Sequence, residues 1–542
     1  MCYKRFGMSG DGLYEQVMAS ASRETLPAVR VKASAGVVPW RRDSHGELEV
    51  FWVERSPELP FMGGFYAFPG GGRSRTDATL EVAGRPQGTD EGPEDGAMPR
   101  AVLDGITLEP LLAAGITGCV VRETFEETGL LLDAGRHRDD LADWRDRLLR
   151  GEISFNEAVD AAKWRLDVSR LVYAGRWLTP PLGPIRFDNR FFLLEWPVSE
   201  PVQPEVCGSE LVAGEWIRPD EALARWRRGD VVTAPPILHI LKVLSESGPT
   251  SGLDRLRSPT EMSLGPHMRI EFRPGVLLFP LPTPTLLPAS HTNTFVLGTR
   301  ESVVVDPGSP YPAQNEGLIA ALRDLESAGR EVTQVWLTHH HPDHIGGVEA
   351  VRRAFGVPVC AHPLTAGHLA AGGIGVDREL RDGQRIVLAG ESPFPVRVIH
   401  TPGHARGHLA FLDETFGSLL GGDLTAGFGT IVIDPPEGNL DDYLASLHKV
   451  KALGARTLFP SHGPPTVAVI EKLDEYIRHR LWREEKVRDG WQRGLRDEGL
   501  LEAIYEDTPP MARPLARRQL LAHLERLNRL GEIALEWRGC GY

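Results

Sequence analysis

The sequence is poor in cysteine and contains no long apolar run. Its 542 residues include five cysteines, at positions 2, 119, 207, 360 and 540, and none of them forms a Cys-x-x-Cys pair. An odd and scattered set argues against a disulfide framework or a cysteine zinc site, and it favours a reducing cytoplasm. No stretch of 18 or more apolar residues occurs, which argues against a membrane-spanning helix.

The chain also lacks an excess of positive charge and a recognisable signal peptide. Its net charge of −14 disfavours non-specific attraction to nucleic acid or to anionic lipid. The segment Met1–Phe6 has no apolar core after its positive charges, unlike a secretion signal. These absences predict a cytoplasmic protein with no membrane partner.

Length and composition predict a multidomain protein. At about 100–200 residues per domain, the chain corresponds to three or four units. Apolar runs and low-complexity segments divide it into a polar arm, a first large unit, a linker rich in serine, glycine and proline, a second large unit and a helical tail. The predicted ranges are 1–27, 28–245, 246–267, 268–474 and 475–542.

A second low-complexity stretch lies inside the first large unit. Residues 73–110 are predicted to be an insertion, and the part up to about residue 100 is rich in glycine, proline and acidic residues. Such a composition cannot bury enough apolar surface to order itself. This part is therefore expected to be disordered and dispensable for folding.

The cluster of residues 337–344 is the strongest functional signal. It contains four histidines and one aspartate directly after an apolar run, an arrangement that delivers several metal ligands to one point. Alternate residues of an extended segment face the same way, so His339 and His341 can bind one ion. A proline then forces a turn, so Asp343 and His344 point elsewhere and suit a second ion. The alternative is an exposed polar turn.

Three further candidate ligands lie downstream. His404, Asp423 and His462 each follow an apolar run and a tight turn. This recurring pattern of strand, turn and single ligand indicates that they serve the same kind of metal site. The interleaved His340 is expected to face away from the ions, and His408 is expected to pack behind the site.

The order HxHxDH, His, Asp, His resembles the metallo-β-lactamase superfamily over about residues 269–474. The resemblance implies an αββα sandwich with a dinuclear zinc centre, in which Asp343 is also a candidate catalytic residue. One zinc ion would be held by His339, His341 and His404, the other by Asp343, His344 and His462, with Asp423 bridging the pair. Two such ions lower the pKa of a shared water and stabilise charge that develops on the substrate oxygen. Asp306 resembles the superfamily's first motif and would orient a ligand histidine.

Three glutamates mark a second candidate metal site. Residues 118–130 are predicted to form a helix on which Glu123, Glu126 and Glu127 lie at i, i+3 and i+4 and share one face. Clustered carboxylates suit a hard divalent cation such as Mg²⁺ or Mn²⁺. Arg122 lies one turn before Glu126 and can hold a carboxylate in place. The alternative is a solvated acidic helix face.

A glycine-rich segment, Gly63–Gly72, precedes this helix in the sequence. Together with Asp77 and residues 122–130 it resembles the Nudix box, with Asp77 in place of the usual glutamate and with the seven-residue spacer expanded to 44 residues. Gly70 and Gly71 are the candidate cofactor-binding residues of this loop.

The split box resembles the peroxisomal coenzyme A diphosphatase branch of Nudix hydrolases, over about residues 29–245. Pro60 departs from that branch, whose coenzyme A signature has an arginine there. The resemblance implies an α/β/α sandwich in which the three glutamates bind the metal that activates water against a diphosphate linkage. Glu126, Glu127 and Arg122 are the candidate catalytic residues, and the implied substrate is a nucleotide or a coenzyme A-like molecule.

The tail contains an amphipathic helix, residues 513–530, with Leu520, Leu524 and Leu527 on one face. A short β-like run, residues 533–537, follows it. The arrangement resembles the winged-helix-like tail of lactamase-beta-like proteins, some of which are endoribonucleases. Five basic residues could contact RNA phosphates or form a solvated helix face: Arg478, Arg480, Arg483, Lys486 and Arg488. A dimerisation element is a third interpretation.

Taken together, the motifs predict a bifunctional metal-dependent hydrolase. Its Nudix domain would cleave a nucleoside diphosphate derivative, and its dinuclear zinc domain would hydrolyse a phosphodiester or ester, with RNA as one option. Two alternatives stay open. The Nudix domain could be a non-catalytic nucleotide or coenzyme A sensor that regulates the zinc site, and the zinc domain could be a glyoxalase-II-like thioesterase. The sequence predicts no oligomeric state.

Overall fold

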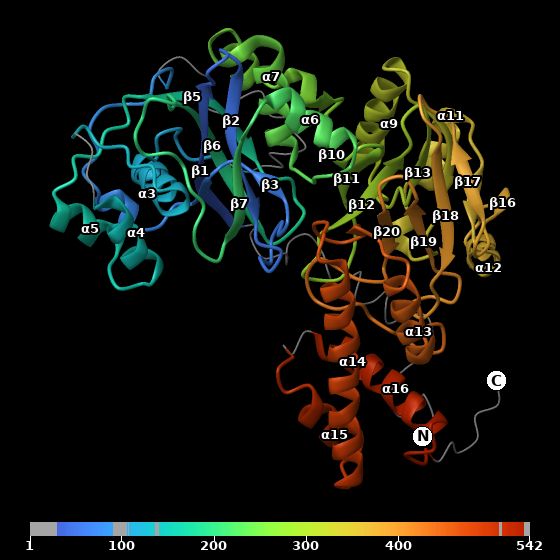
Figure 1. Cartoon of the computed structure of the whole chain (residues 1–542). Helices are drawn as coiled ribbons and strands as arrows, with labels where there is room; N and C mark the ends of the chain where they lie inside the picture. Colours follow the sequence, from blue (N-terminus) through green and yellow to red (C-terminus); the bar gives the residue numbers. More distant parts are fainter. Residues whose placement is uncertain (1–29, 90–105, 107, 136–139, 509–511, 536–542) are drawn as a thin grey trace. The chain divides into compact units, whose positions relative to one another are not determined.

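The computed structural model describes residues 30–89, 106, 108–135, 140–508 and 512–535 (Figure 1). The predicted N-terminal arm lies outside these residues. The chain divides into two compact units, with the division between Phe279 and Pro280. Mixed sheets and helices occur in both units, which confirms the predicted multidomain class with α/β and α+β parts.

The first unit is built on a seven-stranded mixed sheet. Its strands run in the order β3-β2-β1-β6-β5, with β4 paired to β1 and β7 paired to β2. The strands are β1 (Arg30–Arg42), β2 (Leu48–Arg55), β3 (Tyr66–Ala67), β4 (Gly70–Gly72), β5 (Leu171–Leu178), β6 (Ile185–Glu195) and β7 (Leu211–Ile217). The central strand β1 is buried from Ala33 to Pro39, as expected for a strand covered on both faces.

The helix α3 (Ile116–Thr128) carries the predicted carboxylates and packs against β1 and β4. Its apolar side faces a core in which the Phe125 ring lies 5.0 Å from the ring of Trp164. The helix ends at Gly129, which is left-handed (φ 75°), as the sequence predicts for a C-terminal glycine. Helices α4 (Leu141–Leu149) and α5 (Phe155–Ala162) lie on the same side of the sheet (Figure 1).

The prediction of disorder from residue 73 onward is wrong for residues 73–89. They include the short helix η3 (Thr76–Thr79), whose Asp77 is buried. Backbone bridges then join Ala83 to Asp167 and Gln87 to Val172. Composition misled because hydrogen bonds and an ion pair with the core order this segment, and its few apolar residues, Leu80 and Val82, pack against the core. Residues 90–105 lie outside the part of the chain that the structure describes.

Residues 246–267, expected as a linker, are folded. Helix α7 (Pro235–Ser251) continues past a kink at Gly248 into α8 (Leu253–Arg257), η4 (Thr260–Met262) and β8 (Ser263–Leu264). Leu256 is fully buried, and a side chain at Gly175 of β5 would meet its carbonyl oxygen at 2.4 Å. The stretch packs on the first unit although its composition lacks periodicity. The domain limits themselves stay a prediction.

The second unit contains two sheets that pack face to face. One runs in the order β12-β13-β14-β15-β16 and the other in the order β17-β18-β19-β20-β21. Ring contacts join them, Trp336 to Phe411 at 5.1 Å and Phe295 to Phe459 at 6.1 Å. The first set comprises β12 (His291–Leu297), β13 (Glu301–Val305), β14 (Glu331–Trp336), β15 (Val359–Ala361) and β16 (Arg378–Glu379). The second comprises β17 (Arg385–Leu388), β18 (Phe394–His400), β19 (Leu409–Asp413), β20 (Ser418–Gly422) and β21 (Thr457–Pro460).

Helices cover the outer faces of both sheets (Figure 1). Helices α9 (Pro312–Ser327) and α11 (Val348–Phe355) pack on β14. On the other side, α13 (Leu440–Lys451) and α14 (Val469–Gln492) share an apolar core with β18, β19 and β20. The result is the predicted αββα arrangement, in which the strand ends and the loops after them are brought together.

The tail consists of helices packed around their own small core. The predicted amphipathic helix is confirmed as α16 (Arg513–Arg529), and Leu520, Leu524 and Leu527 are buried against α14 and α15 (Asp497–Ile504). The predicted β-like run lies partly outside the described residues, since these stop at residue 535. Within the described ranges, no helix is long and apolar enough to cross a bilayer.

Candidate active sites

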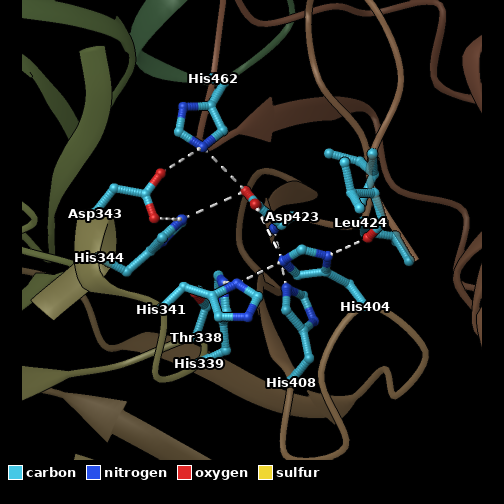
Figure 2. Close-up of polar contacts among 12 residues, drawn as sticks. Thr338, His339, His341, Asp343, His344, His404, His408, Asp423, Leu424 and His462 are labelled. Atoms are coloured by element: carbon cyan, nitrogen blue, oxygen red, sulfur yellow. Dashed lines mark hydrogen bonds and ion pairs between the residues drawn. The ribbon is translucent and has the colours of Figure 1, made fainter. Parts of the chain in front are cut away.

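The predicted ligands of the second unit all follow the carboxyl ends of strands, and the structure brings the seven side chains together (Figure 2). The loop after β14 and the short helix α10 (Pro342–Ile345) contribute His339, His341, Asp343 and His344. The loops after β18, β20 and β21 contribute His404, Asp423 and His462.

Three imidazoles form the first group. The Nε2 atoms of His339 and His404 lie 3.0 and 2.9 Å from Nδ1 of His341. The Nδ1 of His404 donates to the carbonyl of Val432 at 2.6 Å. The Nδ1 of His339 lies 3.0 Å from the Thr338 hydroxyl, which gives its own hydrogen to a carboxylate and so accepts here. Both Nε2 atoms are therefore lone-pair donors aimed at one place.

Asp343, His344 and His462 form the second group, and all three side chains are buried. The Nε2 of His462 lies 3.6 Å from Asp343 Oδ2, and the Nε2 of His344 lies 3.9 Å from Asp343 Oδ1. The Nδ1 of His462 donates to the carbonyl of His291 at 2.9 Å, which leaves its Nε2 lone pair facing the group. Backbone acceptors thus fix the tautomers of ligand rings in both groups.

Asp423 lies between the two groups. Its Oδ2 is 3.4 Å from Nε2 of His404 in the first group. Its Oδ1 is 3.5 Å from Nε2 of His344 and 3.4 Å from Nε2 of His462 in the second. One carboxylate therefore presents one oxygen to each group, as Figure 2 shows, and this is the geometry of a bridging ligand.

This donor set fits two divalent metal ions of the zinc type, which take imidazole and carboxylate ligands. Three ring nitrogens of the first group lie about 3 Å apart, close enough to bind one shared cation. In the second, the buried atoms His344 Nε2 and Asp423 Oδ1 make no hydrogen bond. A buried polar atom without a hydrogen bond is costly, and a metal ion would satisfy both.

The surrounding charges set the protonation of these groups. Burial and the neighbouring histidines hold the pKa of His339 and of His341 well below the ordinary value, so both rings are neutral. Burial raises the pKa of Asp423, but His462 and His344 lower it more, so the net pKa lies well below its usual range. Asp423 is therefore an anion at neutral pH, which is the form that binds metal.

Asp306 supports the centre from behind. Its carboxylate accepts the Thr338 backbone N–H at 2.8 Å and the Thr338 hydroxyl at 2.6 Å, and it lies 2.8 Å from His344 Nδ1. Nearby, a side chain at Gly308 would meet the carbonyl oxygen of Asp343 at 1.9 Å, so the two loops approach closely. The contact with His344 is the one expected of a residue that orients a ligand ring.

His408 packs behind the centre, as expected from the sequence, and makes a contact that the sequence did not reveal. Its Nε2 accepts the backbone N–H of Asp423 at 2.9 Å, so its Nδ1 carries the hydrogen and donates to the Thr401 hydroxyl at 2.8 Å. Burial, followed by the charge of His404, lowers the pKa of His408 to about 3 and keeps the ring neutral. The only signal for this role was its place four residues after His404 in the same loop.

The candidate site of the first unit forms where α3 meets the glycine loop. The Gly70 N–H donates to Glu127 Oε2 at 2.6 Å. A side chain at Gly70 would meet the Ala35 carbonyl at 2.3 Å, and one at Gly71 would lie 2.5 Å from the Glu123 carboxylate. Glycine is therefore required at both positions so that the loop can approach β1 and the helix.

Arg122 organises the carboxylates of this site. It pairs with Glu123 at 2.8 Å and Glu126 at 3.0 Å, and it binds both oxygens of Asp77, at 2.7 and 3.0 Å. Asp77 thus anchors the arginine that separates two of the glutamates. Among the residues that the structure describes, the three glutamates are not part of any group of three ligand atoms within 4.8 Å. The spacing in the sequence correctly placed the three glutamates on one helix, but their ligand atoms do not meet at one point.

The pKa values of the three glutamates are shifted in the direction expected for a cation site. Burial raises the pKa of Glu127 to about 8 and that of Glu123 to about 7, although Arg122 opposes the second shift. Burial also raises the pKa of Glu126. Buried carboxylates that repel one another are stabilised by a hard divalent cation, so their chemistry fits Mg²⁺ or Mn²⁺.

A cavity of about 340 Å³ opens beside the glycine loop, within the first unit. Its lining is largely apolar and includes the aromatic rings of Phe65, Trp177 and Phe191, with Arg55 and Glu210 as the charged residues. Sequence reasoning did not find this cavity, because its walls come from segments far apart in the chain. A group attached to a diphosphate at the glutamates would have an apolar surface to pack on.

Three protein-family models match the chain in consecutive order. The NUDT19 Nudix domain matches residues 21–244, the metallo-beta-lactamase superfamily matches residues 287–462, and the beta-lactamase associated winged helix domain matches residues 498–536. The lactamase-like protein vrtG of Penicillium aethiopicum is 30% identical over 242 residues, which cover 44% of this chain and 70% of that protein. The chain belongs to the metallo-beta-lactamase superfamily.

Two further relatives each match about a third of the chain. The beta-lactamase-like protein 2 homolog of Caenorhabditis elegans is 32% identical over 204 residues, 36% of this chain. The chain spans 64% of the length of that relative. The atrochrysone carboxyl ACP thioesterase of Aspergillus fumigatus is 33% identical over 196 residues, 36% of this chain and 56% of that protein. Together with the domain matches, these relatives indicate a hydrolase and confirm the predicted fusion of a Nudix, a metallo-β-lactamase and a winged-helix domain.

Two of the five basic residues of the tail, Arg480 and Arg483, are engaged internally. Arg480 is buried and donates to Gln519 at 2.8 Å and to the carbonyl of Ile431. Arg483 is also buried and pairs with Asp507 at 3.1 Å. Both side chains, which the sequence offered as candidates for RNA contact, are therefore occupied by contacts within the protein.

Proposed function

We propose that the chain is a bifunctional hydrolase with one active site in each unit. The second unit would hydrolyse an ester or thioester at a dinuclear zinc centre. The first unit would cleave a nucleoside diphosphate derivative of the coenzyme A type with the help of Mg²⁺ or Mn²⁺. The observation that carries the proposal is the position of the Asp423 carboxylate, which presents one oxygen to each of two ligand groups.

In the second unit, one ion would be held by His339, His341 and His404, the other by Asp343, His344 and His462, with Asp423 between them. Two such ions supply a nucleophile at neutral pH and polarise the bond that is attacked. The contribution of the chain is preorganisation. Carbonyl and carboxylate contacts to the outer ring nitrogens orient the lone pairs before any ligand arrives.

In the first unit, Glu123, Glu126 and Glu127 would bind the cation and the diphosphate it accompanies. Arg122, anchored by Asp77, would position the first two glutamates and compensate their charge. Gly70 and Gly71 would let the phosphate chain approach the helix, because neither carries a side chain. The aromatic cavity beside the loop would take the nucleobase or acyl part of the substrate.

A thioester is the favoured substrate class of the second unit. One relative is named as a thioesterase that acts on acyl carrier protein. The resemblance of the split Nudix box to the coenzyme A diphosphatase branch supports a substrate of the coenzyme A type for the first unit. Coenzyme A and acyl carrier protein both carry acyl groups as thioesters, so one class of substrate would serve both units.

Two other readings each have one supporting observation. The winged-helix match supports a phosphodiester such as single-stranded RNA, although Arg480 and Arg483 are engaged internally. The pairing of Arg122 with Glu123 and Glu126 supports a Nudix domain that senses a nucleotide or coenzyme A without cleaving it.

The test uses the full chain with an acyl-coenzyme A thioester, free coenzyme A and a short single-stranded RNA. The wild type is expected to release thiol from the first and to cleave the diphosphate of the second. Asp423→Asn should lose only thiol release, and Glu126→Gln should lose only diphosphate cleavage. If the chain cleaves RNA and releases no thiol, the substrate of the second unit is a phosphodiester instead of an ester. Binding of coenzyme A without cleavage would establish the sensor instead.

A further inference from the structure

A second cluster of metal-ligating side chains lies outside the dinuclear centre. It consists of His340 from the loop after β14, His368 from α12 (Pro363–Ala371) and Glu437 from the loop before α13. The ligand atoms of these three residues lie within 4.8 Å of one another. None of them belongs to the seven ligands described above, and the sequence analysis assigned His340 only to the side that faces away from the ions.

His340 turns its ring toward α12. Its imidazole stacks on that of His368, with ring centroids 4.1 Å apart and planes within 8° of parallel. The Nδ1 of His340 is buried and makes no hydrogen bond. A buried ring nitrogen without a partner is costly, so a ligand for that nitrogen would stabilise the arrangement.

Glu437 completes the cluster and is held in place by the backbone. Its Oε1 accepts the N–H of Arg406 at 2.8 Å. Its Oε2 lies 3.5 Å from Nε2 of His368. The side chain of His368 is 48% exposed, so an ion can reach the cluster from solvent.

We propose that His340, His368 and Glu437 bind a third divalent transition-metal ion, zinc or a similar metal, with water as the remaining ligand. Two imidazoles and one carboxylate are a ligand set that zinc accepts, and they leave a position open. Lone pairs of parallel rings do not converge, so the half-exposed ring of His368 turns when the ion binds. The third ion is therefore expected to exchange more readily than ions at the buried centre.

The third ion would join segments that border the dinuclear centre. His340 lies between the candidate ligands His339 and His341, and Glu437 lies in the loop whose Val432 carbonyl holds His404. Binding would cross-link both segments to α12. The proposal does not depend on the substrate of either unit, because its readout is the number of ions bound.

The experiment titrates the full chain as purified with zinc chloride, with bound metal counted by equilibrium dialysis against free zinc and binding followed by calorimetry. The wild type is expected to bind one saturable equivalent more than His368→Ala. His368→Asp, which restores a ligand atom, should recover that equivalent, and Glu437→Gln should weaken it. The control is His448→Ala, an exposed histidine of α13 that belongs to no ligand cluster of the described residues.

Equal zinc content in the wild type and His368→Ala would overturn the third site. A similar loss in His448→Ala would show adventitious surface binding and would overturn it too. The difference between variants does not require two ions at the dinuclear centre. If the wild type binds a total other than three zinc ions but still binds one more than His368→Ala, the result counts against the dinuclear proposal alone.

Discussion

The two candidate sites balance buried charge in different ways. In the second unit, imidazoles surround the anionic Asp423 carboxylate, and outer contacts to Val432 O and His291 O leave the ring lone pairs of His404 and His462 facing inward. In the first unit, three carboxylates are crowded on one helix, and Arg122 lies against two of them. The histidine centre of the second unit is already arranged to bind metal ions. The glutamate site of the first unit is instead held together by Arg122, a cation of the chain itself.

The two sites therefore have different requirements for binding their metal ions. The histidine centre requires only that ions enter a set of oriented lone pairs. At the glutamate site, the cation must either displace the Arg122 guanidinium from the carboxylates or bind the carboxylates together with it. Metal affinity should therefore be high in the second unit and lower, and dependent on a phosphate-bearing ligand, in the first.

The largest effect is expected from Glu126→Gln. Loss of this carboxylate removes a cation ligand, and diphosphate cleavage should fall by roughly 10²–10⁴-fold, as for the loss of a catalytic acid or base. Thioester hydrolysis should be unchanged, because Glu126 belongs to the first unit. Steady-state rates with coenzyme A and with an acyl thioester measure both. A joint loss would show that the two sites are not separate.

Asp423→Asn should lower thioester hydrolysis by more than the roughly 100-fold typical of changes behind a metal site, because it removes the shared ligand. Metal analysis in a His368→Ala background, which lacks the proposed third site, should find about two zinc ions, as a dinuclear centre requires, and fewer once Asp423→Asn is added. Asp442→Asn, an exposed residue of α13, is the matched control. A wild type that is fully active without metal would contradict the dinuclear centre.

Asp77→Ala probes the anchoring of Arg122. The Asp77 side chain is fully buried, and removing it leaves the guanidinium without its main partner. Breaking such a buried pair costs roughly 3–5 kcal/mol, so the first unit should unfold at lower denaturant concentration. Hydrogen exchange along α3 reports the change. Unaltered protection there would show that residues 73–89 contribute little to this unit.

His408 distinguishes a positioning role from packing. His408→Leu removes the acceptor of the Asp423 N–H and should lower zinc affinity and thioester hydrolysis by roughly 10–100-fold. His408→Gln keeps an acceptor and should recover part of this loss. Equal behaviour of the two variants, with equal unfolding midpoints, would assign His408 to packing alone.

The smallest effect concerns a buried histidine outside both sites. Burial lowers the pKa of His267 to about 4, so the unfolded state takes up a proton that the folded state does not. The stability of the first unit should therefore fall as pH drops from 7 to 5.5, by about 1 kcal/mol from this group. His267→Phe should reduce that slope, measured by hydrogen exchange in β9 (His267–Met268) and its neighbours. An unchanged slope would show that His267 does not set the acid sensitivity of the first unit.

Much of the architecture could be read from local patterns. The helix that carries the glutamates, its end at Gly129 and the amphipathic helix of the tail follow from spacing and from a glycine cap. Composition failed for residues 73–89, since an ion pair and backbone bridges order them. It also failed to show that residues 246–267 are folded, because their order comes from packing on β5.

The sequence alone determined the kinds of ligand and their spacing, since one helix face and one strand-to-turn motif are local properties of the chain. Which nitrogen of each ring faces the centre depends on the folded chain, because the groups that hold the other nitrogen come from distant segments such as Val432 and His291. The folded chain also brings Arg122 to Asp77 across an interrupted motif. The groups that compensate a buried charge are those that the fold brings close to it, and the fold as a whole determines which groups are buried.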